Sequence, residues 1–169
     1  MIQNNKPSQI NTKKPNYLLV MPRLVQNIGD GYSFPLGISY ISSSMKKAGY
    51  NVATLNLNHR NGDVYEIIKK EIGEKKIDVV ATGGLSFQYS TVRSVVEAAK
   101  RVNGEIITIV GGGIISGDPE PAMMALEYAD FGVIGEGEIT INELCNAIEH
   151  KGSFSDISGI IYKSDNFFI

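Results

Sequence analysis

The sequence predicts one doubly wound α/β domain of three layers, with a parallel sheet between two layers of helices. Its 169 residues, of which 43% are hydrophobic and 20% charged, match a single globular domain with a full core. From Tyr17 onward, short apolar runs rich in β-branched residues alternate with segments in which apolar residues recur at helical spacing. This alternation is typical of repeated strand and helix units around a parallel sheet.

Six segments have the composition of strands. Runs such as VVA and IITIV are apolar without interruption, as expected for strands covered on both faces. The predicted strands are Tyr17–Met21, Asn51–Leu57, Asp78–Gly83, Ile106–Val110, Phe131–Ile134 and, as an edge addition or part of a further domain, Gly159–Tyr162.

Five segments between these strands carry helix start signals as well as helical spacing. Proline suits the first position of a helix, and a Ser, Thr or Asp with Glu three residues later forms a capping box. The predicted starts are Pro35 (with the helix ending at Gly49), Asp63 with Glu66, the segment before Val92, Asp118 with Pro119, and Thr140 with Glu143.

Strict alternation of five strands and five helices favours a flavodoxin-like (Rossmann-like) sheet of strand order 2-1-3-4-5. Right-handed crossovers leave few other arrangements for a chain this short. Half of a Rossmann sheet is the alternative. We expect residues 16–163 to form the domain, after a polar, disordered lead-in over 1–15. The apolar end, 164–169, has no helix cap or turn signal, so we expect it to begin a linker in a longer protein.

Composition argues against several partners and settings. A net charge of −2 and a pI near 5.7 give no electrostatic basis for binding nucleic acid. No run approaches the roughly 20 apolar residues that cross a bilayer, so no membrane partner is expected. The single cysteine, Cys145, forms no internal disulfide, which predicts a cytoplasmic, reducing setting.

Loops at the carboxyl ends of the strands are where such folds bind ligands. The first loop, PRLVQNIGDGYSFP, is long for a connection of this type. Glycine pairs or triplets follow the third strand (Gly83, Gly84) and the fourth (Gly111 to Gly113). They serve either tight turns or the close approach of a bulky ligand. Because the two clusters lie on adjacent strands, we favour a ligand and expect an open groove between these loops.

Several other chemistries lack their residues. The third strand ends Ala81-Thr82-Gly83, without the aspartate of a phosphoacceptor receiver. No phosphate loop, no Gly-x-Gly-x-x-Gly after the first strand and no hydroxyl-rich flavin loop is present. His59 and His150 have no partner at metal-ligand spacing, so we predict surface histidines, no metal site and no catalytic residue.

Several segments resemble the cobalamin-binding domain at the N-terminus of cobalamin-dependent radical SAM enzymes. In order, they are PLGISYISSSMKKAGYNV, VVATGGLSFQYSTVRSVVEAAK, IVGGGIISGDPEPAM, ADFGVIGEGEITINEL and DISGIIYK, together covering most of the chain from Leu19 to Lys163. The fourth carries the family's Gly-Glu-Gly-Glu signature, and the last resembles the segment that leads into the radical SAM barrel.

The resemblance implies that cobalamin lies across the strand ends, with its dimethylbenzimidazole tail near the third and fourth loops. Ser86 matches the family's hydroxyl after the third strand, and Gly111 and Gly112 match its glycine pair. Glu136 and Glu138 either contact the cofactor or a partner domain, or stabilise a helix end. The cofactor-binding residues we expect are Gly84, Leu85, Ser86, Phe87, Tyr89, Gly111, Gly112, Gly113, Gly135, Glu136 and Gly137.

The sequence also departs from this family and its relatives. The Asp-x-His-x-x-Gly motif that supplies an axial histidine in methionine synthase is absent, so any cobalamin is expected to bind without that ligand. Gly113-Ile114 replaces a frequent Pro-His, so the fourth loop is expected to contact the corrin differently from the family's usual way.

One cysteine cannot hold a [4Fe-4S] cluster, so the cluster, S-adenosylmethionine and radical chemistry would belong to an absent C-terminal radical SAM domain. We expect a module of an enzyme similar to the anaerobic magnesium-protoporphyrin monomethyl ester oxidative cyclase or to a radical SAM methyltransferase, not catalytic alone. The alternative is a stand-alone interaction or small-ligand module without a cofactor.

Overall fold

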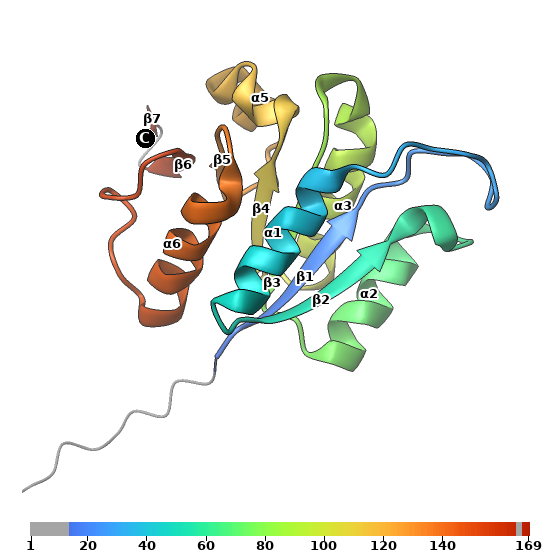
Figure 1. Cartoon of the computed structure of the whole chain (residues 1–169), viewed down its shortest axis with the longest axis horizontal. Coiled ribbons are helices and arrows are strands. Elements are labelled where there is room, and N and C mark those ends of the chain that lie inside the picture. The colour runs from blue at the N-terminus through green and yellow to red at the C-terminus, as the bar shows by residue number, and fades with distance from the viewer. Residues whose placement is uncertain (1–13, 165–166) are drawn as a thin grey trace, which may run out of the picture.

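A computed structural model describes residues 14–164 and 167–169 of the chain. It confirms the five predicted parallel strands, each within about a residue or two of its expected ends, as secondary-structure boundaries normally vary. They are β1 (Asn16–Met21), β2 (Asn51–Asn56), β3 (Val79–Gly83), β4 (Ile107–Gly111) and β5 (Phe131–Val133). Their order in the sheet is β2-β1-β3-β4-β5, all parallel, so the flavodoxin-like order 2-1-3-4-5 is confirmed (Figure 1).

The sheet continues beyond β5 with strands that are each antiparallel to the strand before. β6 (Ile160–Ser164) is antiparallel to β5, which confirms the sixth predicted strand. That it is part of a further domain stays a prediction. β7 (Phe167–Phe168) is antiparallel to β6. Residues of β6 and β7 fall within 164–169, the range in which the sequence predicted the start of a linker. That a linker begins there stays a prediction. Residues 165–166, and the expected lead-in up to residue 13, lie outside the described residues.

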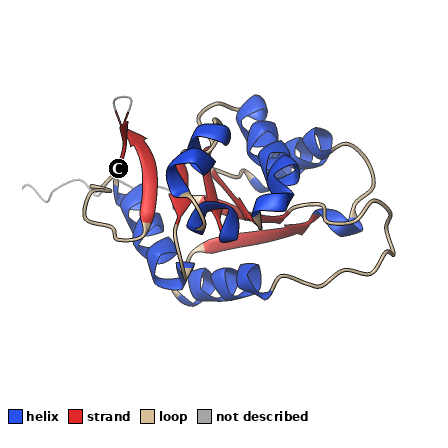
Figure 2. Ribbon diagram, turned by 90° about the horizontal axis from the view of Figure 1, so that it is seen from above, coloured by secondary structure: helices blue, strands red, loops and turns tan. Residues whose placement is uncertain are grey.

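Helices cover both faces of the sheet, giving the three predicted layers (Figure 2). α1 and α6 pack on one face, whereas α2 and α3, with the short α4 and α5, pack on the other. None of the helices in the described part of the chain has the length and apolar character needed to cross a membrane. The helices are α1 (Leu36–Lys47), α2 (Val64–Lys75), α3 (Tyr89–Val102), α4 (Gly113–Ser116), α5 (Pro119–Ala125) and α6 (Gly137–His150), with 3₁₀ turns at Leu57–His59 (η1) and Ser86–Gln88 (η2).

Alternate side chains of β1 belong to the two layers of the core. Tyr17 and Leu19 point to the layer of α1 and α6, and Leu18 and Val20 point to the layer of α2 and α3. All are nearly fully buried, as expected for a central strand covered on both faces.

The predicted helix starts have mixed outcomes. The Asp63 side chain accepts a hydrogen bond from the Glu66 amide at 3.2 Å, which confirms the start of α2. The start predicted at Thr140 is wrong, because α6 already begins at Gly137. Gly135, with a φ of +73°, turns the chain into the helix early, and the Thr140 hydroxyl instead donates to the Ser158 carbonyl at 3.3 Å.

Two smaller differences concern α1 and α4. Pro35 precedes the first helical residue of α1 and does not occupy it. The sequence predicted a loop over Gly113–Ser116, where the structure forms the single turn of α4, with the Ile115 and Ser116 amides donating to the Gly112 carbonyl. Helical periodicity cannot be detected in so short a segment.

Candidate functional site

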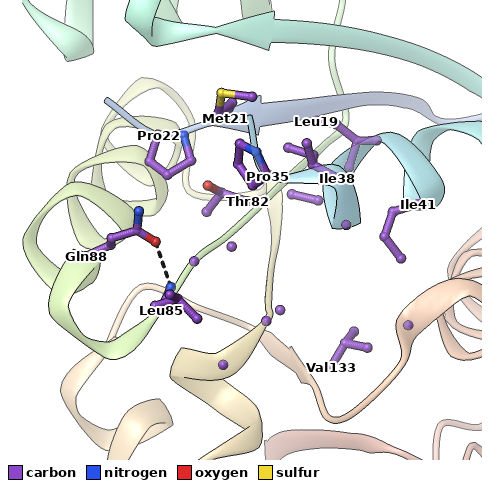
Figure 3. A pocket seen from close by; sticks show the side chains of 18 of the residues that line it. Leu19, Met21, Pro22, Pro35, Ile38, Ile41, Thr82, Leu85, Gln88 and Val133 are labelled. Atoms are coloured by element: carbon purple, nitrogen blue, oxygen red, sulfur yellow. Dashed lines mark hydrogen bonds between the residues drawn. The ribbon is translucent and has the colours of Figure 1, made fainter. Parts of the chain in front are cut away.

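A cavity of about 660 Å³ opens at the carboxyl ends of the parallel strands, on the face that α1 and α6 cover. Its floor consists of side chains from four neighbouring strands, Leu19, Ala81, Ile109 and Val133. Aliphatic side chains of the two helices complete the walls: Ile38 and Ile41 from α1 (Figure 3), and Ile141 from α6. The deep part of the cavity is therefore aliphatic.

Missing side chains keep this space open. Gly111 lies two residues beyond Ile109 and so on the same side of β4. A Cβ atom there would only reach ordinary contact distance, 3.8 Å, from Val133 Cβ. A Cβ atom on Gly137, at the start of α6, would lie 3.0 Å from Ile41 Cδ1 and 3.3 Å from Val133 Cγ1. Larger residues at these positions would fill the upper part of the cavity.

The loops after β3 and β4 bind each other directly. The Gly84 amide donates to the Gly111 carbonyl at 3.2 Å, and the Ile114 amide donates to the Gly84 carbonyl at 2.9 Å. Gly112 has a φ of +86°, and a Cβ atom on it would lie 2.8 Å from the Gly84 oxygen. The groove expected between these two loops is thus absent, because their backbones are in contact; the cavity lies beside them, towards α1. Gly112 serves a left-handed turn and close packing.

Most of the predicted cofactor-binding residues come together around this cavity. Ser86 and Tyr89 do not line it: Ser86 begins η2, and the Tyr89 hydroxyl donates to the Ala125 carbonyl at 2.9 Å, joining α3 to α5. The predicted residues that line the cavity are Gly84, Leu85, Phe87, Gly111, Gly112, Gly113, Gly135, Glu136 and Gly137. Among these, the side chains of Leu85 and Phe87 are exposed at 53% and 79%, which places two free apolar groups at the cavity mouth.

Sequence reasoning missed the floor and wall residues. Leu19, Ala81 and Ile109 look like ordinary core positions in the sequence, and the spacing of two along a strand is the signal that places each on one face. Which of the two faces is hollow depends on how the helices pack, so the strand pattern alone does not identify these residues.

The long first loop borders the cavity with Pro22, Leu24, Ser33 and Pro35. Its beginning is anchored by Asn58, a residue of η1 that is only 3% exposed. The Asn58 Oδ1 atom accepts hydrogen bonds from the Leu24 amide at 2.6 Å and the Val25 amide at 3.2 Å, and its Nδ2 donates to the Pro22 carbonyl. A buried amide thus fixes one side of the cavity mouth.

Neither histidine lines the cavity. His59 is exposed on η1, where its Nε2 atom lies 2.9 Å from the Tyr32 hydroxyl. That hydroxyl also accepts a hydrogen bond from Asn56 Nδ2 at 2.7 Å, so Tyr32 links η1 to the end of β2. His150 is the last residue of α6, at the opposite end of that helix from the cavity.

Two carboxylates stand at the mouth beside α6. Glu136 immediately precedes the helix, and its side chain makes no capping hydrogen bond, while Glu138 lies in the first turn. The backbone carbonyl of Glu138 accepts from the Ser44 hydroxyl at 2.8 Å, which ties α6 to α1. Neither carboxylate takes part in the ion pairs found among the described residues.

No three His, Cys, Asp or Glu side chains form a candidate metal site within residues 14–164 and 167–169. Cys145 is fully buried in α6, and burial raises the pKa of its thiol to about 12. The thiol is therefore protonated at neutral pH, which suits a residue of the core.

An apolar cavity at the carboxyl rim of a doubly wound sheet defines a small-ligand-binding α/β domain. The profile of the B12-binding domain matches residues 27–145, and the chain belongs to that family.

Known proteins resemble this chain in sequence and in fold. An uncharacterized methyltransferase of Pyrococcus horikoshii is 28% identical over 134 residues, which are 78% of this chain and 28% of that protein. A structure of the radical S-adenosylmethionine methyltransferase TsrM from Kitasatospora setae, with cobalamin and a [4Fe-4S] cluster bound, superposes with a TM-score of 0.79 at 20% identity, over 93% of this chain and 30% of that one.

The cobalamin-dependent S-adenosylmethionine radical enzyme OxsB, with aqua-cobalamin bound, gives a TM-score of 0.74 at 19% identity, over 94% of this chain and 22% of that one. The chain thus spans less than a third of the length of these relatives.

Proposed function

We propose that this chain is the cobalamin-binding module of a larger radical SAM enzyme, and that the nucleotide tail of cobalamin enters the cavity. The observation that carries the proposal is the aliphatic cavity beneath Gly111 and Gly137, in a chain of the B12-binding domain family. A volume of about 660 Å³ suits the flat tail base, whereas the corrin ring is too large and would remain at the mouth. When bound, cobalamin supplies cobalt chemistry that no side chain provides.

The residues of the cavity fit the parts of this ligand. The floor of Leu19, Ala81 and Ile109 offers apolar contact to a buried base. The exposed side chains of Leu85 and Phe87 give apolar contact at the mouth, on the side of the corrin. Glu136 and Glu138, in the same rim, are acceptors suited to the amide side chains of the corrin.

We further propose that this chain supplies no histidine to cobalt. The support is that neither histidine borders the cavity and that the exposed His59 is hydrogen-bonded to the Tyr32 hydroxyl. The single cysteine of the chain is buried, so a [4Fe-4S] cluster and S-adenosylmethionine would be held by a radical SAM domain elsewhere in the polypeptide.

The much greater length of the relatives supports this division of the enzyme. The methyltransferases among them favour a methyl-transfer reaction over the cyclase type for the whole protein.

The absence of a membrane-spanning helix from the described residues, and a buried free thiol, are compatible with the cytoplasmic setting that we propose.

Titration of hydroxocobalamin into the chain, followed by the visible spectrum and by equilibrium dialysis, tests the proposal. We expect saturable binding of one molecule per chain. Gly111→Leu should weaken binding at least about tenfold, because its side chain enters the cavity while its backbone needs no positive φ. Gly73→Leu, on the exposed surface of α2 with nothing within 4 Å of its Cβ position, is the matched control and should bind normally.

His59→Ala tests the axial ligand separately. We expect its bound spectrum to equal that of the wild-type chain. A changed spectrum would show that His59 coordinates cobalt. No saturable binding by the chain, nor by the full-length protein, would refute the proposal and favour a stand-alone module without a cofactor.

A further inference from the structure

We infer that the cavity discriminates among cobamides by their lower base, favouring phenolic and benzimidazole bases over purines. This inference rests on the proposed function, since it requires that the nucleotide tail occupies the cavity. It adds the class of cobamide that the site selects, which the family alone does not define.

The deep part of the cavity offers no side-chain hydrogen-bond donor. Leu19, Ala81, Ile109 and Val133 form its floor, and Ile41 forms its wall. Thr82, which follows Ala81 in β3, also lines the cavity and has a polar side chain. Its hydroxyl already donates to the Val20 carbonyl at 2.9 Å.

The other polar side chains that line the cavity come from loops and helix ends at the mouth, and they are Ser33, Gln88, Ser116, Glu136 and Glu138. Gln88 Oε1 accepts from the Leu85 amide at 2.7 Å (Figure 3). The Ser116 hydroxyl oxygen accepts from the Gly135 amide at 2.8 Å, and Glu136 is exposed. Groups in this position can meet the sugar, the phosphate or the corrin amides, but not a base that lies on the floor.

Bases differ in how many polar atoms they would bring to that floor. A phenolic base has no polar ring atom, and a benzimidazole detached from cobalt has a single free ring nitrogen. Adenine adds an amino group and further ring nitrogens. Each polar group buried without a partner weakens binding by roughly tenfold. The aliphatic floor therefore discriminates against the purine, whereas the apolar contact is similar for all of these bases.

Equilibrium dialysis of this chain with p-cresolylcobamide, cobalamin, adeninylcobamide and the tail-less cobinamide, all reduced to cobalt(II), tests the inference. We expect adeninylcobamide to bind at least about tenfold more weakly than p-cresolylcobamide, and cobinamide to bind weakly as well. Equal constants for the cresolyl and adeninyl forms would overturn the inference. Of the cresolyl and adeninyl forms, only the adeninyl form has a base that can bind cobalt. Releasing this base costs free energy, which further weakens the binding of adeninylcobamide, so it cannot conceal the expected discrimination.

Paired variants separate the cavity's contribution from that of base release. Val133→Thr places a hydroxyl on the cavity floor, and Val110→Thr makes the same change on the opposite face of the neighbouring strand. The cost of releasing the base belongs to the free cobamide and cancels when one protein is compared with another. We expect the adeninyl to cresolyl ratio of dissociation constants to fall at least about threefold in Val133→Thr and to stay unchanged in Val110→Thr. A ratio that neither variant changes, or that both change alike, would overturn the inference.

Cobinamide distinguishes the remaining outcomes. If no cobamide and no cobinamide binds, the proposed cobalamin-binding function itself fails. If cobinamide binds as tightly as p-cresolylcobamide, the tail does not occupy the cavity. The inference is then overturned, although the domain still binds a corrinoid.

Discussion

The two faces of the central strands are built from alternate residues of the same short segments, yet one is filled and the other is partly hollow. Leu18 and Val80 are fully buried against α2 and α3. Their sequence neighbours Leu19 and Ala81 form the floor of the cavity beneath α1 and α6. What distinguishes the faces is the lack of side chains at the carboxyl end, as at Gly137. A ligand site can thus arise from removed volume in an ordinary core, without any added polar residue.

The largest expected effect is a difference in stability between the neighbours Leu18 and Leu19. Leu18→Ala should lower the free energy of unfolding by about 2–5 kcal/mol, because packed groups surround it on the filled face. Leu19→Ala should cost at least about 1 kcal/mol less, since the cavity already deprives one side of Leu19 of packing partners. Urea unfolding of both variants measures this. Equal losses would show that the two faces are equally well packed.

An intermediate effect separates two adjacent glycines of the rim. Gly112→Ala should destabilise the fold by about 1–3 kcal/mol, because of its positive φ and its contact with the Gly84 oxygen. Gly111→Ala should leave stability unchanged or slightly improved, as its Cβ position is unstrained, but should weaken cobalamin binding. Urea titration and dialysis of each variant give both quantities. If Gly111→Ala unfolds the domain, Gly111 is structural too.

The smallest expected effects concern the residues just before two helices, α2 on the filled face and α6 on the partly hollow face. Asp63 caps α2, so Asp63→Ala should cost about 0.5–2 kcal/mol. Glu136 makes no such hydrogen bond, so Glu136→Ala should cost only about 0.3–1 kcal/mol through the helix dipole, and should weaken cobalamin binding if the side chain contacts the corrin. Thermal melts and dialysis distinguish these effects. A changed melting temperature with unchanged binding would mean that Glu136 serves the helix end alone.

Sequence patterns predicted the strands closely, because continuous apolar runs such as Val79 to Ala81 have few alternative uses. They also predicted that the glycine loops after β3 and β4 would border the candidate site. They failed at the start of α6, where the conformation of Gly135 outweighed the local capping signal of Thr140. They failed as well at the groove, since hydrogen bonds between Gly84 and Gly111 join residues far apart in the chain.

The sequence by itself determined the fold class and the strand order, and it predicted the rim at which the cavity opens, because periodicity and the right-handed crossover rule apply to each strand and helix unit separately. Only the tertiary structure decided that the hollow lies beneath α1 and α6, with Leu19, Ala81 and Ile109 as its floor. It also decided that Gly112 serves a turn, while Gly111 and Gly137 leave space. The physical reason is that a cavity is the volume that several elements fail to fill together, and no single segment encodes that sum.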